Sequence, residues 1–387
     1  MRNKLFSLAL ILIMAMSFSF SVAAQETGDA SAQPDIGTAG INNASESLTN
    51  GQAQAIFNDI RQRILFKYGE IYSFDNFSFE LKNERIEDGR TLVDADVYAD
   101  MTLTRHPSDS PFIKGMSASL SGIGNKAEKA LVKSKIDGYI GEIEKLYYNK
   151  PDYSVFSYSI ALSSNASNDI SADSTPYELF YRTDVTAEEI LLEPAGDLKK
   201  AEDYTSAEES GIRAAAEIQS NISGPSLMAA VTYDRLAARD YALNNATAAP
   251  EFSGSGNSDC ANFVSKSLNS GGIPEDSSGN WYRASTYGSV GTCGTNWMRT
   301  GYNNNGGVVP YMTGKSYFYK ESTVSKVFAG SIMYWTNTSH VALVTYGDTV
   351  TIKYTQHSNY QLTSSEATKV YQSESAYFYM PSASIMK

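Results

Sequence analysis

Bulky apolar residues become scarce between Glu193 and Ser226, and this gap constrains the fold more than any other feature of the sequence. Apolar patterns typical of helices and strands lie on both sides of it. The chain has 387 residues, whereas a single hydrophobic core stops growing at roughly 250–300 residues. We therefore predict two folded units, the first segment at 51–193 and the second segment at 227–387, joined by a linker at 194–226.

Residues 1–24 have the features of a secretory signal peptide. Arg2 and Lys4 precede a long apolar run, and small residues at Val22-Ala23-Ala24 offer a cleavage site. Residues 25–50 are rich in small and polar residues, which predicts a flexible leader. We expect a secreted, extracellular protein, either free or associated with the cell wall, with no membrane-spanning segment after signal cleavage.

The formal net charge is −12, and removal of the two basic residues of the signal peptide makes the chain more acidic still. Binding to nucleic acid or to anionic wall polymers by charge alone requires clusters of Lys and Arg, which the sequence lacks. We therefore predict no nucleic-acid partner, and a stereospecific contact for any binding to the cell wall. The sequence implies no cofactor, and it leaves the oligomeric state open.

The first segment carries the pattern of an α+β unit. We predict helices and strands in the order helix, hairpin, helix, two strands. Their predicted ranges are 52–66 (helix), 72–82 and 91–104 (strands joined by Glu87-Asp88-Gly89), 125–148 (helix), 153–162 and 177–184 (strands). His106 stands at a strand end before Pro107, and we expect it to be exposed and inert.

The second segment places helices before strands, which also indicates an α+β fold. Apolar residues from Ala229 to Tyr241 share one helical face, and a further helix is predicted over 259–268, ended by Gly271-Gly272. The predicted strands are 331–335, 340–346, 349–355 and 376–380.

Cys260 stands in the first turn of a predicted helix, where Asp259 is expected to cap the helix by accepting a backbone N–H. Free backbone N–H groups and the positive end of the helix dipole favour the thiolate, which is the nucleophilic form. The charge of Asp259 opposes this effect, so a nearby imidazolium is needed. Cys260 is therefore the candidate nucleophile.

Two histidines are candidates for the partner of this cysteine. The pair Gly347-Asp348 predicts a two-residue hairpin turn in which Tyr346 faces Thr349. In that register His340 and His357 share one face of the sheet, with diagonal neighbours roughly 7–8 Å apart at Cα. A base histidine held by a second polar residue, both facing a helix-start cysteine, is the arrangement that acyl transfer needs.

These residues resemble a bacterial amidase domain family, a branch of the papain-like NlpC-type peptidoglycan hydrolases. The resemblance covers about Tyr233 to Ser358. It rests on Tyr233-Asp234-Arg235, Tyr241-Ala242, Asp259-Cys260-Ala261-Asn262-Phe263-Val264-Ser265, Gly271-Gly272, Trp281, Trp297, Ser339-His340-Val341-Ala342 and Gln356-His357-Ser358. The chain departs from the family pattern at Ser331, where aspartate usually follows glycine, and at Lys266, which replaces a glutamine.

The resemblance implies a papain-like cysteine hydrolase domain, in which a helix-start cysteine packs on an antiparallel sheet. It makes Cys260 the nucleophile, His340 the general base and His357 the residue that orients the base. The implied activity is hydrolysis of an amide bond in peptide or peptidoglycan material of the cell wall. From the residues themselves, Tyr233, Trp281 and Trp297 are the candidates for substrate contact, with a core role as the alternative.

Three other interpretations remain open. A disulfide between Cys260 and Cys293 is permitted in an exported chain and would abolish thiol chemistry. The same cysteines with His340 and His357 are the right residue types for zinc, although they lack the close pairs of structural zinc sites, and we expect no metal. A non-catalytic wall or surface protein could use the same fold to bind peptides.

Overall fold

The structure is a computed structural model. It describes residues 41–43, 45–162, 177–184, 190–196, 199–201, 206–221, 231–252, 259–283, 293–301, 306–336, 338–357, 367–372 and 375–386. The expected signal peptide lies outside these residues, and so does most of the expected leader. Among the described residues, no helix combines the length and apolar character that crossing a membrane requires.

The first segment contains the predicted hairpin, helices and strands, with several additional elements. In chain order they are β1 (Ile41–Asn43), α1 (Asn50–Tyr68), β2 (Tyr72–Glu87), β3 (Arg90–Leu103), α2 (Pro111–Ser119), α3 (Lys126–Leu146), β4 (Pro151–Leu162), β5 (Tyr177–Asp184) and β6 (Ile190–Pro194). Short 3-10 turns at Pro107–Asp109 and Leu120–Gly122 flank α2.

The rest of the chain places helices before strands, as predicted. Its elements are α4 (Ala207–Asn221), α5 (Arg235–Asn245), α6 (Cys260–Ser270), α7 (Thr295–Met298), α8 (Val308–Gly314), β7 (Phe318–Glu321), β8 (Ile332–Trp335), β9 (His340–Gly347), β10 (Ile352–Thr355), β11 (Lys369–Val370) and β12 (Tyr377–Pro381), with a 3-10 turn at Val324–Lys326. The strands β7 and β11 and the helices α7 and α8 were not predicted.

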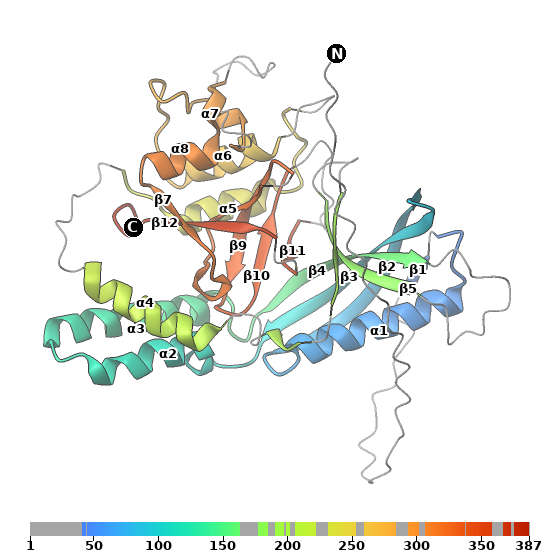
Figure 1. Ribbon diagram of the computed structural model, residues 1–387, viewed down its shortest axis with the longest axis horizontal. Helices are drawn as coiled ribbons and strands as arrows, with labels where there is room; N and C mark the ends of the chain where they lie inside the picture. Colours follow the sequence, from blue (N-terminus) through green and yellow to red (C-terminus); the bar gives the residue numbers. More distant parts are fainter. Residues whose placement is uncertain are drawn as a thin grey trace, which may run out of the picture. The chain divides into compact units, whose positions relative to one another are not determined.

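All the named strands belong to one 12-stranded mixed sheet, ordered β1-β2-β3-β4-β11-β10-β9-β8-β12-β7, with β5 on β4 and β6 on β5. The two segments join where β11 pairs in parallel with β4, through Lys369 and Val155 (Figure 1). Residues Thr38–Lys387 form one compact unit. The fold is therefore mixed α/β around a sheet shared by both segments, and the papain-like assignment stays a prediction.

Three apolar clusters stabilise this fold, and two of them lie on opposite faces of β8 and β9. The first cluster joins α1 and β2–β4 to β8–β10, and its members include Ile56, Ile60, Val97, Phe156, Met333, Trp335, Ala342, Val344 and Tyr354. The second cluster joins α5, α6 and α8 to the other face, and its members include Ala238, Cys260, Phe263, Ile332, Val341 and Leu343. The third cluster joins α2, α3 and α4 through residues that include Phe112, Met116, Val132, Ile136 and Ala215.

Local sequence explains the first hairpin and the helix that covers it. Asp88 and Gly89 both adopt positive φ between β2 and β3, as a two-residue hairpin turn requires. Thr49 and Gln52 form a capping box at the start of α1, which satisfies N–H groups that lack partners within the helix. Figure 1 shows α1 along β2 and β3. Residues at the end of the predicted leader belong to α1 and to β1, which pairs with β2.

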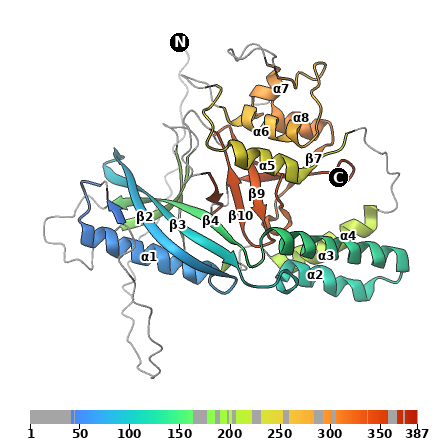
Figure 2. The same ribbon diagram turned by 180° about the vertical axis from the view of Figure 1, so that it is seen from behind.

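The predicted linker contains a helix that packs. Figure 2 shows α4 side by side with α2 and α3. The backbones of α2 and α4 approach so closely that a Cβ on Gly115 or Gly211 would lie 2.0 Å from a carbonyl oxygen of the opposite helix. The scarcity of bulky apolar residues predicts a linker here, but the small residues of this stretch allow two helices to touch. In α3, Leu131 is exposed while Val132 is buried.

Polar and aromatic contacts also connect the two segments. Lys353 of β10 is fully buried, and its ammonium binds Asp152 at 2.5 Å and Ser154 at 2.7 Å. The rings of Tyr147 and Tyr346 lie 4.0 Å apart. A buried charge of the second segment is thus neutralised by the first segment.

Candidate active site

Cys260 is the first residue of α6, as predicted, and only 2% of it is exposed. It packs in the second cluster against the face of β9 that carries Val341 and Leu343. No disulfide joins Cys260 and Cys293, so the disulfide alternative is not formed in the structure. Cys260 therefore carries a reduced thiol at the start of a helix.

Asp259 does not cap α6 with its side chain, and that prediction is wrong. Its carboxylate instead binds His357 Nδ1 at 2.7 Å and accepts a hydrogen bond from the amide of Asn262 at 2.9 Å. Both Asp259 and His357 are buried. The backbone of Asp259 is helical, with φ −80° and ψ −3°, whereas a residue that caps with its side chain has a non-helical backbone.

His357 lies against α6, one turn along from the cysteine. Its ring stacks on Phe263 with centroids 4.2 Å apart, and its Nε2 lies 2.8 Å from the backbone carbonyl of Asn245. A carbonyl and a carboxylate can only accept hydrogen bonds. Both ring nitrogens of His357 therefore face hydrogen-bond acceptors, the carboxylate of Asp259 and the carbonyl of Asn245.

His340 begins β9 and is fully buried. Its Nε2 lies 2.6 Å from Oε1 of Gln356, while its Nδ1 has no hydrogen-bond partner. Burial lowers the pKa of His340 to about 4, although the bond to Gln356 and the nearby Asp184 carboxylate act in the opposite direction. The ring is therefore neutral near pH 7, with one nitrogen free.

The two histidines lie on opposite faces of the sheet, and the predicted common face is wrong. Side chains alternate along a strand, so His340 shares the face of Ala342 and Val344 in the first cluster. Its ring also contacts Trp335 of that cluster, with centroids 5.3 Å apart. His357 stacks instead on the helix that covers the other face.

The register of β9 and β10 explains this separation. Gly347 pairs with Ile352, so a four-residue loop replaces the predicted two-residue turn. A bulge between Lys353 and Tyr354 then shifts the pairing by one residue, and a one-residue shift exchanges the faces of all later side chains. Beyond the bulge, Gln356 falls on the face of His340. The family resemblance implies that His357 orients His340, whereas the residue that contacts His340 in the structure is Gln356.

The three predicted substrate contacts are core residues in the structure. Tyr233, Trp281 and Trp297 are all at most 1% exposed. The hydroxyl of Tyr233 donates to the carbonyl of Gly330 at 2.7 Å, and burial raises its pKa. Trp297 donates to Asn262 at 2.8 Å. These side chains support α6 from within, and the described part of the chain gives them no open groove to line.

Several remaining residues can also be placed. His106 binds Glu144 at 2.7 Å and is partly exposed, far along the chain from the cysteine segment. Lys266, one departure from the family pattern, forms an ion pair with Glu251. Ser331, the other departure, donates to the carbonyl of Phe328 at 2.7 Å. Among the described residues, no group of three or more His, Cys, Asp or Glu side chains could hold a metal ion.

Sequence reasoning missed the role of Gln356, although the motif Gln356-His357 was noted. The only signal in the sequence was the position of Gln356 next to His357. Neighbouring residues of a strand point to opposite faces, so the sequence alone does not show which of these two polar side chains faces His340. Asp184 was also missed. Its carbonyl accepts a hydrogen bond from Gln356 at 2.5 Å, across 172 residues of sequence.

Comparison with known proteins gives one match. Residues 232–380 match the family model described as "putative amidase domain". No curated protein and no solved structure matches the chain. The match supports an amidase-like domain over these residues, and it suggests a hydrolase that acts on amide bonds.

Proposed function

We propose that this chain is an exported, cysteine-dependent amidase or peptidase that cleaves an amide bond in cell-wall peptide material. Cys260 is the nucleophile, His340 is the general base, and Gln356 orients His340. The family match supports the amidase class. The pattern of residues 1–24 supports export, and the stated resemblance to NlpC-type hydrolases suggests the substrate.

The hydrogen bonds of the two histidine rings decide which histidine we propose as the general base. A general base must be neutral and must have a free lone pair. His340 has both, because its Nε2 is bound to Gln356 while its Nδ1 has no partner. His357 offers no free lone pair in the described arrangement, since both its nitrogens face acceptors.

The reaction follows from these roles. Sγ of Cys260 attacks the amide carbonyl while its proton passes to Nδ1 of His340. Backbone N–H groups at the start of α6 stabilise the oxyanion. His340 then gives the proton to the leaving amine, and a thioester remains on Cys260. Water attacks the thioester with His340 as base, and a carboxylic acid and free Cys260 result.

The ion pair next to Cys260 assists the nucleophile. The negative charge of Asp259 alone would disfavour a thiolate at the neighbouring residue. His357 lies 2.7 Å from that carboxylate and neutralises it. The positive end of the α6 dipole then acts on the thiol without an opposing charge.

The mechanism also sets a geometric requirement. Cys260 and His340 each begin their element, α6 and β9, and His340 lies on the face of the sheet away from α6. Proton transfer requires the thiol and Nδ1 to lie within hydrogen-bonding reach in the substrate complex, so a Cys260 thiol that alkylates equally fast near pH 6 in the wild type and in His340→Gln contradicts this role of His340.

The second candidate function is peptide binding without catalysis. It is favoured by the burial of Cys260, of which 2% is exposed, because reactive cysteines are usually partly exposed. The same fold would then hold a peptide without attacking it.

Incubation of purified peptidoglycan and short muropeptides with the protein separates the two functions. Mass spectrometry should reveal new amine and carboxylate ends with the wild type and none with Cys260→Ala. Cys293→Ala is the matched control and should remain active. Identical product profiles for wild type and Cys260→Ala, with retained binding, would establish the binding function.

A further inference from the structure

The amide of Gln356 bridges the two segments of the chain. Its Oε1 lies 2.6 Å from His340 Nε2, and its Nε2 donates to the backbone carbonyl of Asp184 at 2.5 Å. All three residues are buried. Asp184 ends β5 of the first segment, whereas Gln356 and His340 belong to the second segment.

Donor and acceptor chemistry orients this amide in only one way. The Asp184 carbonyl can only accept, so the NH₂ group of Gln356 must face it. The oxygen of the amide must then face His340, and an oxygen can only accept. His340 Nε2 therefore carries the proton, and the lone pair is at Nδ1. The backbone carbonyl of Asp184, in the first segment, therefore sets the tautomer of His340 through the amide of Gln356.

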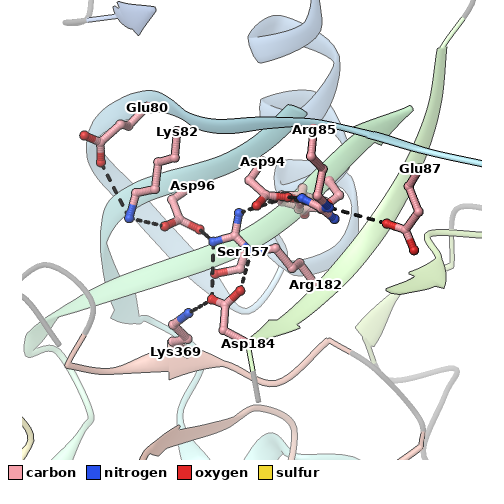
Figure 3. A network of polar contacts seen from close by, with 12 residues as sticks. Glu80, Lys82, Arg85, Glu87, Asp94, Asp96, Ser157, Arg182, Asp184 and Lys369 are labelled. Carbon is pink, nitrogen blue, oxygen red and sulfur yellow. Dashed lines mark hydrogen bonds and ion pairs between the residues drawn. The ribbon is translucent and has the colours of Figure 1, made fainter. Parts of the chain in front are cut away.

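Buried charges hold Asp184 in place. Its carboxylate binds Arg182 at 2.9 Å and Lys369 at 2.5 Å. Arg182 in turn binds Asp96 at 2.9 Å, and Figure 3 shows it between Asp96 and Asp184, with Lys369 on Asp184 as well. Burial alone would raise the pKa of Asp184, but the two cations outweigh it and hold the pKa below its usual range.

We propose that Asp184 is a positioning residue for His340, which fixes the Nε2–H tautomer of that ring through the amide of Gln356. The catalytic value of this device rests on the proposed function, because only there is Nδ1 the base. The tautomer itself does not depend on that function. The first segment is then part of the active site rather than a separate helper.

Nitrogen NMR of histidine-labelled full-length protein tests the tautomer directly. The chain has three histidines, and His106→Gln and His357→Gln assign their signals. In the wild type near pH 7, we expect His340 to be neutral with its proton on Nε2. Gln356→Leu should release this preference, so that the Nδ1–H form becomes populated. A wild-type His340 that is an imidazolium, or that carries its proton on Nδ1, overturns the proposal.

Asp184→Asn tests the part played by the first segment. This change keeps the size of the side chain but weakens the contacts to Arg182 and Lys369, so it should increase the Nδ1–H form of His340. Asp152→Asn is the matched control, since Asp152 also binds a buried lysine across the two segments, Lys353 at 2.5 Å, without contacting Gln356. Should Asp184→Asn fail to fold, Lys369→Gln removes one of the two anchors instead. Spectra of His340 that are the same in the Asp184 or Lys369 variant and in the Asp152 control overturn the role of Asp184.

Kinetics then separate this inference from the proposed function. With an active wild type, Asp184→Asn should lower kcat with little change in KM, because substrate binding is untouched. It should also move the acid limb of the pH profile to lower pH, since the Asp184 charge favours protonated His340. An unchanged kcat and pH profile contradicts the positioning role. A wild type without turnover but with the expected tautomer contradicts only the proposed function.

Discussion

The carboxylate of Asp259 binds His357 at 2.7 Å, immediately before the first residue of α6. This contact uses the aspartate that the sequence pattern assigns to the helix cap, and the histidine that the family resemblance assigns to orienting the base. The result is a buried ion pair beside Cys260. His340 is left to pair with Gln356 on the other face of the sheet.

Replacement of Cys260 should abolish turnover without loss of the fold. We expect Cys260→Ala to lower kcat by at least about 10³-fold, because the thioester cannot form. The near-ultraviolet circular dichroism should be unchanged, and Cys293→Ala should keep full activity. Activity that persists in Cys260→Ala contradicts the mechanism.

The pKa of His340, lowered by burial to about 4, predicts a pH dependence of activity and of stability. The folded state resists protonation of a ring that the unfolded chain protonates at about 6.5. The free energy of unfolding should therefore fall as pH drops from about 6.5 to about 4, by about 3 kcal/mol in total from this group. Denaturant unfolding at several pH values measures this.

His340→Gln is the control for this pH dependence, since it removes the titrating ring while keeping a polar side chain. Its stability should vary less across the same window. In the active wild type, kcat/KM should rise with pH through the same pKa, because His340 acts in its neutral form. Equal slopes for the two proteins contradict the burial of His340.

Loss of the Asp259 carboxylate should destabilise the protein. Asp259→Ala leaves the buried His357 ring without its carboxylate partner, and we expect a loss of about 3 kcal/mol. The double variant Asp259→Ala/His357→Gln should lose less than the sum of the single variants, because the ring left without a partner is gone. Denaturant unfolding of all four proteins measures the coupling, and strict additivity contradicts a direct ion pair.

Contact between α2 and α4 should be sensitive to a single methyl group. A Cβ on Gly115 would lie 2.0 Å from the carbonyl of Glu208, so Gly115→Ala should cost about 1–3 kcal/mol. Gly138→Ala in α3 meets nothing within 4 Å and should instead stabilise by up to about 1 kcal/mol. Thermal unfolding of the two variants compares them, and equal effects contradict the close packing.

The second segment alone should not fold to a native state. Its Lys353 is buried and bound to Asp152, and β8–β10 share the first cluster with α1 and β2–β4. Expression of residues 227–387 should therefore give an aggregated or molten product that binds a hydrophobic dye. A cooperative unfolding transition of this fragment would instead support the division of the chain into two independent domains.

Much of the local structure was predictable because it depends on neighbouring residues. The turn at Asp88-Gly89 follows from the positive φ that such a turn demands, and β5 begins and ends where alternation predicted it. The helix-start position of Cys260 was also predicted correctly. The packing of α4 was not predicted, because a stretch with few bulky apolar residues indicates a linker in isolation, and α2 and α3 give its small residues a surface to pack on.

The sequence by itself determined which side chains could carry the chemistry, since two cysteines and three histidines leave few choices. Only the tertiary structure decided which of them meet. The four-residue loop of the β9–β10 hairpin and the bulge between Lys353 and Tyr354 set the faces of Gln356 and His357. Because side chains alternate with a period of two, one extra residue in a strand exchanges the partners of both histidines. That bulge, together with a carbonyl from β5, gives His340 its partner, and no pattern within the second segment alone contains this information.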